Sequence, residues 1–311
     1  MRRFLSVVVG TLVVATVSST GVAEAMRPVA GASPTVVTTT VRYGPYTIPA
    51  ASGSMMGEIQ NQVDFGVTKP CGACYLTSMK ANLVDASGMT LNVDMGLVLH
   101  HIVLTDSGRS DATCAGTPLG QLGQRFFASG NERTPVKLPP GYGYYVRRSD
   151  AWNMISDLMN MNPTSETVYV KVRFTYSTTA QTRVTPAWLD INECGNSEYT
   201  IPAGLSDTHW DWTVNVPGRI VFVAGHIHND GVDIRATNAT TGRKICDSVA
   251  TYGGTPGYID MMGMPWISTM SSCAASPVAR VLAGQTVRID SIYDSPTQQT
   301  DVMGIMVAYI A

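Results

Sequence analysis

Short runs of β-branched and aromatic residues alternate along the chain with clusters of Gly, Pro, Asn and Asp. The runs that predict strands are VVTTTVRY, GMTLNVDMGLVLHHIVL, TVYVKVRFTY, GRIVFVAGHIH, GVDIRAT, QTVRIDSIY and DVMGIMVAYI. The clusters between them are typical of turns. One segment, 151–161 (AWNMISDLMNM), predicts a short helix. The pattern therefore indicates an all-β protein of antiparallel sheets, arranged as sandwiches or jelly rolls.

A five-residue segment occurs twice, because YTIPA at 46–50 recurs at 199–203. Each copy is followed by small polar residues and then by a strand that carries paired histidines. This repeat predicts two tandem jelly-roll-like antiparallel β-sandwich domains. Their expected bounds are 46–195 and 196–311, which are ordinary domain sizes. Residues 26–45 are expected to form a linker or a leading strand.

The first 25 residues predict a signal peptide. Arg2 and Arg3 precede an apolar stretch at 4–17, and residues 23–25 (AEA) form a small-residue cleavage site. No later stretch approaches the length of apolar sequence that a membrane span needs. We therefore expect a secreted or otherwise exported protein with no membrane span after cleavage.

Charge and cysteine content restrict the classes of function. The formal net charge is −2 and only 14% of residues are charged, so no basic field for binding nucleic acid is expected. In an oxidising compartment an even number of cysteines predicts disulfides. Six cysteines give three disulfides and 15 possible connectivities; they are Cys71, Cys74, Cys114, Cys194, Cys246 and Cys273.

Four of the five histidines lie in two tight motifs, His100-His101 and His226-Ile227-His228. Residues i and i+2 of a strand point to the same face, so His226 and His228 can present two imidazoles to one metal ion. Adjacent His100 and His101 point to opposite faces unless a bulge or a strand end interrupts the pattern. The alternative is that these are ordinary polar residues at the mouth of a sandwich.

The type of ligand suggests the metal. Imidazoles without nearby carboxylates suit Zn, Cu, Fe or Ni, and an added thioether indicates copper because sulfur is a soft ligand. The chain has 16 methionines. Most, including Met261, Met262 and Met264, are expected to fill the core. Met303 is the candidate ligand.

The chain resembles the copper type II, ascorbate-dependent monooxygenases, the family of the peptidylglycine- and dopamine-hydroxylating enzymes. The resemblance rests on ordered features across most of the chain: Cys74 before the pair His100-His101, the turn LPPGYG at 138–143, the H-x-H motif of His226 and His228, and the strand DVM at 301–303.

The resemblance implies two domains that face each other across a solvent-filled cleft, with one copper ion on each. His226, His228 and Met303 would hold the catalytic copper, which activates dioxygen to hydroxylate a C–H bond of a small-molecule or peptide-like substrate. His100 and His101 would belong to a second copper site, which passes on electrons from ascorbate or a similar reductant. One or two copper ions per chain are therefore expected.

Three departures from the family pattern matter. Arg173 stands where the family has a third histidine of the first site, and arginine cannot ligate copper because it stays protonated. That site is therefore a two-histidine site, a site completed by another residue, or empty. Ala224 and Val307 replace the residues that grip a peptide carboxylate, which disfavours a peptidylglycine substrate. His209 is not at a family position.

The resemblance also implies a pairing of the cysteines, namely Cys74 with Cys114, Cys71 with Cys194, and Cys246 with Cys273. The leading hypothesis is thus a secreted copper-dependent monooxygenase. A secreted copper-binding or copper-buffering protein that retains one site is the alternative. A structural or adhesive double sandwich without metal is the third hypothesis.

Overall fold

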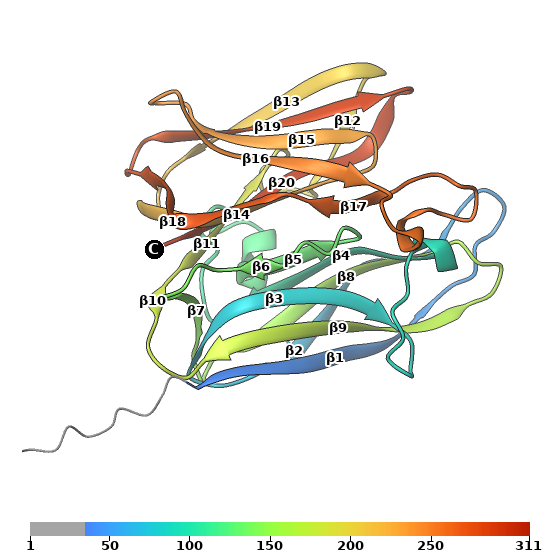
Figure 1. The fold of residues 1–311 in the computed structure, drawn as a ribbon, viewed down its shortest axis with the longest axis horizontal. Helices are drawn as coiled ribbons and strands as arrows, with labels where there is room; N and C mark the ends of the chain where they lie inside the picture. Colours follow the sequence, from blue (N-terminus) through green and yellow to red (C-terminus); the bar gives the residue numbers. More distant parts are fainter. Residues whose placement is uncertain (1–34) are drawn as a thin grey trace, which may run out of the picture. The chain divides into compact units, whose positions relative to one another are not determined.

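The computed structural model describes residues 35–311, and Pro34–Ala311 form one compact unit. The expected signal peptide lies outside the described residues. Four β-sheets make up this unit (Figure 1). In the described part of the chain no helix is long and apolar enough to cross a membrane. The helical elements there are 3-10 turns: η1 (Val93–Met95), η2 (Leu119–Leu122) and η3 (Pro256–Tyr258).

Two sheets come from the first half of the chain and pack on each other. Sheet I contains, in spatial order, β1 (Val36–Ile48), β9 (Glu166–Ser177), β3 (Cys74–Val84), β7 (Tyr142–Val146) and β10 (Thr182–Arg183), with β6 (Val136–Lys137) beside β3. Sheet II contains β2 (Gly57–Val67), β8 (Trp152–Asn160), β4 (Leu97–Asp106) and β5 (Gln124–Gly130). All pairs are antiparallel except β7 with β10.

The other two sheets come mainly from the second half. Sheet III contains β11 (Thr185–Asp190), β20 (Gln299–Ile310), β14 (Gly218–Ile227) and β18 (Ser272–Val281), with β12 (Glu198–Ile201) beside β20. Sheet IV contains β13 (Gly204–Thr213), β19 (Thr286–Ser295), β15 (Gly231–Asn238), β16 (Arg243–Tyr252) and β17 (Ile267–Met270). Figure 1 shows sheets III and IV above sheets I and II. The all-β prediction is confirmed.

Each pair of sheets encloses a hydrophobic core. On β9 every second residue is buried, with Val168, Val170, Val172 and Phe174 all at 0% exposure, as a strand with one core face requires. The first core lies between sheets I and II, and the second between sheets III and IV. Phe222 and Tyr309 of sheet III join the first core, which ties the two sandwiches together. The division into domains at residue 195 stays a prediction.

The helix predicted at 151–161 is wrong, because these residues form strand β8. β8 lies between β2 and β4, and most of its side chains on both faces are buried. A strand covered on both faces has no polar alternation, and a short apolar run of this kind cannot be told from a buried helix by its period. The correction matters because β8 carries Asp157.

Three disulfides are present, but two of the expected pairs are wrong. Cys246 pairs with Cys273 as expected, whereas Cys114 pairs with Cys194 and Cys71 with Cys74. The pairs Cys74–Cys114 and Cys71–Cys194 do not form. Cys74 opens β3 in sheet I, while the loop between β4 and β5 holds Cys114 at the junction of sheets II and III, where Cys194 follows β11.

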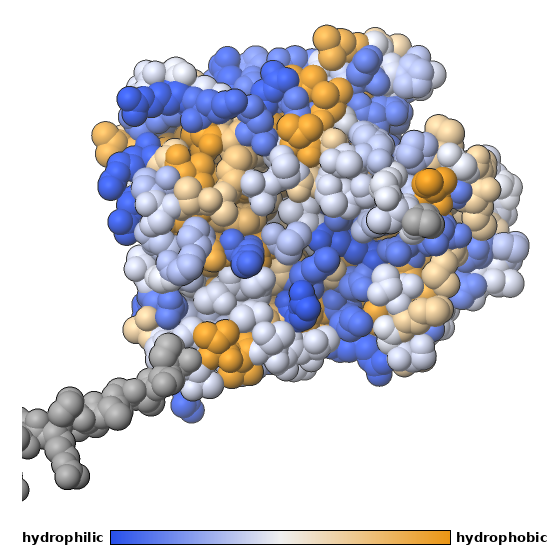
Figure 2. All heavy atoms as spheres, viewed as in Figure 1, coloured by the Kyte–Doolittle hydropathy of each residue, from blue (hydrophilic) through white to orange (hydrophobic). Residues whose placement is uncertain are grey.

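On the face of the molecule shown in Figure 2, hydrophilic residues are mixed with small apolar areas. Such mixing is normal for a folded protein, since polar atoms are too few to cover its whole surface. The candidate chemistry lies instead between the sheets.

Candidate metal centre

A β-bulge in β4 brings His100 and His101 together. Against β8 the register shifts between Leu99, which pairs with Leu158, and His101, which pairs with Asp157. His100 is therefore the extra residue, and the usual alternation of faces fails at this point. The centroids of the two imidazole rings lie 3.9 Å apart. The irregular backbone that the adjacent pair needs is thus present.

The end of β14 presents the other pair. His226 is the penultimate residue of the strand and His228 follows its last residue, with the Ile227 side chain buried between them. The hydroxyl of the buried Tyr293 accepts the His228 backbone N–H at 2.7 Å and donates to the Met303 carbonyl at 2.6 Å. This hydroxyl therefore fixes the backbone of His228 relative to that of Met303.

The two motifs meet in one cluster. Nε2 of His101 lies 3.1 Å from Nε2 of His226 and 3.1 Å from Nε2 of His228. Ligand atoms of His100, His101 and His228 all lie within 4.8 Å of one another. We call these four residues the histidine cluster.

This geometry differs from the arrangement that the resemblance implies, in which two copper sites face each other across a solvent-filled cleft. Sheet II, which carries the first pair, and sheet III, which carries the second, pack so closely that imidazoles from both sheets are in contact. The four histidines therefore lie in one cluster.

Two buried carboxylates hold the outer ring nitrogens. Both oxygens of Glu132, which is 6% exposed, lie 3.2 Å from His226 Nδ1. Asp157, which is 5% exposed, lies 3.3 Å from His100 Nδ1 and 3.9 Å from His101 Nδ1. The hydrogen bond from His226 to Glu132 is the kind of contact that fixes the orientation and the tautomer of a metal-binding imidazole, whereas His100 Nδ1 and Asp157 Oδ1 form no hydrogen bond. The two carboxylates correct the expectation of a site without nearby carboxylates.

Sequence reasoning missed both carboxylates for specific reasons. Asp157 lies in the segment that was expected to be helical, so its place opposite His101 was hidden. Glu132 lies in the turn after β5 and approaches the cluster only because Gly130 has no side chain. A Cβ at Gly130 would lie 2.5 Å from Glu132 Oε2 and 2.5 Å from His226 Cε1. The signal that could have found Glu132 is this Gly-x-Glu turn, once the β4–β5 pairing is known.

The electrostatics favour neutral imidazoles beside an ionised carboxylate. Burial, followed by the charges of neighbouring histidines, holds the pKa values of His101 and His228 well below the usual range. Burial alone would raise the pKa of Glu132, but the charge of His226 and its hydrogen bond outweigh burial and lower that pKa. Neutral imidazole has the free lone pair that a metal ion needs.

Two cavities meet at the histidine cluster. The first, which we call the Arg125 cavity, has a volume of about 160 Å³ and is bordered by His101, His226 and Met303 as well as Arg125. The second has a volume of about 200 Å³ and is bordered by His100, His228 and Trp266. The cluster is therefore accessible from two sides.

The remaining residues singled out in the sequence lie as follows. Met303 borders the Arg125 cavity together with His226. Arg173 is exposed on β9 of sheet I, and His209 is exposed on β13 of sheet IV, so both lie on sheets that do not carry the cluster.

The expectation that Met261, Met262 and Met264 fill the core is wrong. They are 59%, 83% and 59% exposed. Their loop is held by Asp260, whose carboxylate accepts the backbone N–H groups of Met262 and Met264 at 2.9 Å each. The turn therefore places these thioethers on the surface.

Fold and site together define an all-β protein of four sheets with a histidine cluster between the two inner ones. A family model described as "Stress up-regulated Nod 19" matches residues 166–311. The chain is 29% identical over 292 residues to the probable copper-dependent oxygenase M1 of Phoma sp., covering 87% of this chain and 71% of that relative. It is 30% identical over 253 residues to the probable copper-dependent oxygenase clz3 of Cochliobolus lunatus, covering 75% and 78% respectively. The chain belongs to the family of these probable copper-dependent oxygenases.

The similarity to solved structures is weak. The match to the STIV MCP has a TM-score of 0.33 at 12% identity and covers 89% of this chain and 97% of that one. The match to the major capsid protein of bacteriophage PM2 has a TM-score of 0.31 at 10% identity, with coverage of 88% and 97%.

Proposed function

We propose that this protein is a secreted copper-dependent oxygenase whose copper ion is held by the histidine cluster. The names of its relatives support the metal and the class of reaction. The three disulfides support an oxidising compartment. The observation that carries the proposal is the contact of three Nε2 atoms at the cluster.

Hydrogen bonding alone does not account for these contacts. In its neutral form, a His226 that donates its Nδ1–H to the Glu132 carboxylate carries a lone pair on Nε2. Nε2 of His101 faces both this lone pair and Nε2 of His228, each at 3.1 Å. If His101 Nε2 bears a proton, it donates to one neighbour and leaves the other without a partner. If it bears none, it faces a second lone pair on His226. A cation bound by His101 and His228, with His100 within reach, would remove this conflict.

The set whose ligand atoms all lie within 4.8 Å of one another is His100, His101 and His228, and the contact between His101 and His228 fits one ion. Imidazole nitrogens bind such metals at about 2.0–2.1 Å, and two of them that subtend 90–110° are then about 2.8–3.4 Å apart. Both observed separations, 3.1 Å, lie within this range. An all-imidazole set suits copper, and the thioether of Met303 beside His226 would favour its reduced form.

Copper at this site would supply the one-electron chemistry that the reduction of dioxygen requires, with electrons from ascorbate or a similar reductant. The protein's own groups prepare the site. Glu132 accepts the outer N–H of His226 and so orients this imidazole, and the Asp157 carboxyl group lies beside the outer nitrogens of His100 and His101. Tyr293 ties the His228 backbone to the Met303 backbone. The Arg125 cavity would place a C–H bond of the substrate beside the cluster for hydroxylation.

The proposal differs from the two-site arrangement that the sequence suggested. We propose one copper ion per chain, with His101 as the central ligand because its Nε2 contacts both histidines of sheet III. His100, His226, His228 and Met303 complete the candidate ligand set. No separate electron-transfer site is needed in this arrangement.

The test uses His101→Ala with His209→Ala as the matched control, since His209 is exposed on a sheet that does not carry the cluster. We expect about one copper per chain in the wild type and in His209→Ala, and less than a tenth of this in His101→Ala. Oxygen uptake with ascorbate should follow the copper content.

Two results would contradict the proposal. Full copper content in His101→Ala would exclude the cluster as the site. Copper bound at the cluster without oxygen uptake above that of His101→Ala, for any substrate tried, would favour the copper-buffering alternative.

A further inference from the structure

We infer that the Arg125 cavity binds a neutral, ring-sized apolar group that carries one oxygen acceptor. This inference rests on the proposed function, because it names the class of substrate that would lie beside the copper ion. It is carried by the lining of the cavity, by its size and by one buried donor without a partner.

The walls of the cavity are apolar between its two ends. Sheet III contributes three cross-strand pairs of β14 and β20, namely His226 with Ile305, Ala224 with Val307, and Phe222 with Tyr309. Sheet II contributes Val103 of β4 and Ala128 of β5, which pair with each other. Along β20 the wall runs four residues from Ile305 to Tyr309, or about 13 Å.

Arg125 has an N–H group that no protein atom accepts. The residue is 2% exposed, and its Nε and Nη2 donate to Asp111 at 2.8 and 3.0 Å. Nη2 also donates to Thr113 at 3.2 Å, but Nη1 has no partner. Leaving a buried donor unpaired is costly. Arg125 borders the cavity, and a ligand oxygen that reached Nη1 would remove this cost.

The volume of the cavity indicates a ligand of the size of one six-membered ring. The cavity measures about 160 Å³, and an engineered apolar cavity of about 150 Å³ in another protein binds benzene.

The charges around the cavity favour a neutral ligand. The charge of Arg125 is already balanced by Asp111, with Nε to Oδ2 at 2.8 Å and both side chains 2% exposed. The other ionisable groups on the lining are carboxylates, at Glu132, Asp157 and Glu198, as well as the histidines. In the metal-free protein a carboxylate ligand would meet these acids without a free cation to pair with, because Arg125 is already paired. A carbonyl or ether oxygen would accept from Nη1 without this repulsion.

The test compares three probes of similar shape on the full chain, with and without copper, by isothermal titration calorimetry. Acetophenone has the ring and a neutral acceptor, ethylbenzene lacks the acceptor, and benzoate is charged. We expect acetophenone to bind at least tenfold more tightly than either of the others. Equal affinity for acetophenone and ethylbenzene, tighter binding of benzoate, or no binding of any probe would each overturn the inference.

Two variants in which leucine replaces an alanine locate the binding site. Ala128→Leu fills the cavity and should weaken acetophenone binding at least tenfold, whereas Ala274→Leu, on the exposed face of β18, should leave it unchanged. Undiminished binding in Ala128→Leu would place the probe elsewhere and overturn the inference. Copper content is measured on the same samples. Acetophenone binding by a chain that takes up no copper would reject the proposed function alone.

Discussion

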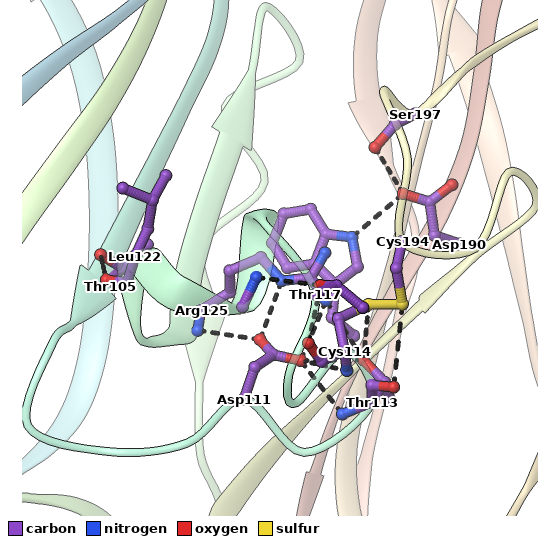
Figure 3. A network of polar contacts seen from close by, with 12 residues as sticks. Thr105, Asp111, Thr113, Cys114, Thr117, Leu122, Arg125, Asp190, Cys194 and Ser197 are labelled. Carbon is purple, nitrogen blue, oxygen red and sulfur yellow. Dashed lines mark hydrogen bonds and ion pairs between the residues drawn. A yellow bond between two sulfur atoms is a disulfide. The ribbon is translucent and has the colours of Figure 1, made fainter.

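The histidine cluster joins sheet II to sheet III, whereas the Asp111–Arg125 pair fastens the β4–β5 loop to β5 within sheet II, and the polar atoms of the two places are satisfied to different degrees. At the cluster, His101 Nε2 faces two imidazole nitrogens at 3.1 Å, and one ring nitrogen can form a hydrogen bond with only one of them. At the pair, the Asp111 carboxylate accepts from Arg125, from Thr113 and from the backbone N–H of Cys114 (Figure 3). Nearby, the Cys114–Cys194 disulfide closes the junction.

This difference separates two tasks at one interface. The Asp111–Arg125 pair fixes the β4–β5 loop on β5, the Cys114–Cys194 disulfide links that loop to the residues after β11 of sheet III, and the cluster lies at the same junction of sheets II and III. Changes at the pair should therefore alter the stability of the fold, whereas changes at the cluster should alter the affinity for copper. The predictions below test whether the two effects can be separated.

The largest effect is expected from the disulfide at the junction. Cys114→Ser/Cys194→Ser opens a link between residues 80 apart in sequence, which should lower the free energy of unfolding by about 4.5 kcal/mol. Cys246→Ser/Cys273→Ser, with a separation of 27, is the matched control and should cost about 3.5 kcal/mol. Urea unfolding gives both values. A larger loss of unfolding free energy in the control would show that the disulfide at the junction is not the more stabilising of the two.

Removal of Arg125 should also destabilise the fold. Arg125→Met leaves the buried charge of Asp111 without its partner, at a cost of about 3–5 kcal/mol. Arg288→Met breaks a pair with Asp211 in which both side chains are about 40% exposed to solvent, and should lower the stability far less because water screens such a pair. If urea unfolding shows that the two variants lose similar amounts of unfolding free energy, the buried pair does not stabilise the fold more than the exposed one.

The same pair predicts a dependence of stability on pH. Burial alone would raise the pKa of Asp111, but the hydrogen bonds and charge of Arg125 outweigh it and lower the pKa to about 2. A carboxyl with a lowered folded-state pKa stabilises the fold above its unfolded value near 4, and this contribution disappears as the pH falls through about 2.

The contribution of Asp111 amounts to about 2 kcal/mol. In Asp111→Asn the loss of stability between pH 4 and pH 2, followed by urea unfolding, should be smaller than in the wild type by this amount. An identical pH profile for the variant and the wild type would exclude Asp111 as the titrating group.

The smallest effect is expected at Glu132. Glu132→Gln keeps the size of the side chain but removes the charge that orients His226, so copper affinity should fall about tenfold while the unfolding free energy of the metal-free protein changes little. Glu166→Gln, on β9 of sheet I, is the control. Unchanged affinity in Glu132→Gln, measured by competition with a copper chelator, would reject the orienting role.

Local patterns were sufficient for part of this molecule. Strands with one core face, such as β9, can be predicted from the alternation of apolar and polar residues. The four clustered histidines stand out because the chain has only five. The strand geometry also indicated that His100 and His101 need a bulge to act together. That bulge exists.

What could not be predicted depends on contacts between distant segments. β8 lacks the alternation of apolar and polar residues because both of its faces are covered. The sequence pattern therefore predicted neither the strand nor the position of Asp157 beside the histidines. The partner of Cys114 depends on how the β4–β5 loop meets the residues after β11. The meeting of the two histidine pairs depends on the packing of sheet II on sheet III, which no local period reports.

The most direct test of the central claim is the number of copper ions per chain and of nitrogen ligands per copper. Copper titration with electron paramagnetic resonance on wild type, His100→Ala and Met303→Ala supplies both numbers. We predict one copper ion with at least three imidazole nitrogen ligands in the wild type. In His100→Ala the spectrum of that same copper ion should be perturbed. Two coppers, one lost in His100→Ala and the other in Met303→Ala, would contradict a single centre.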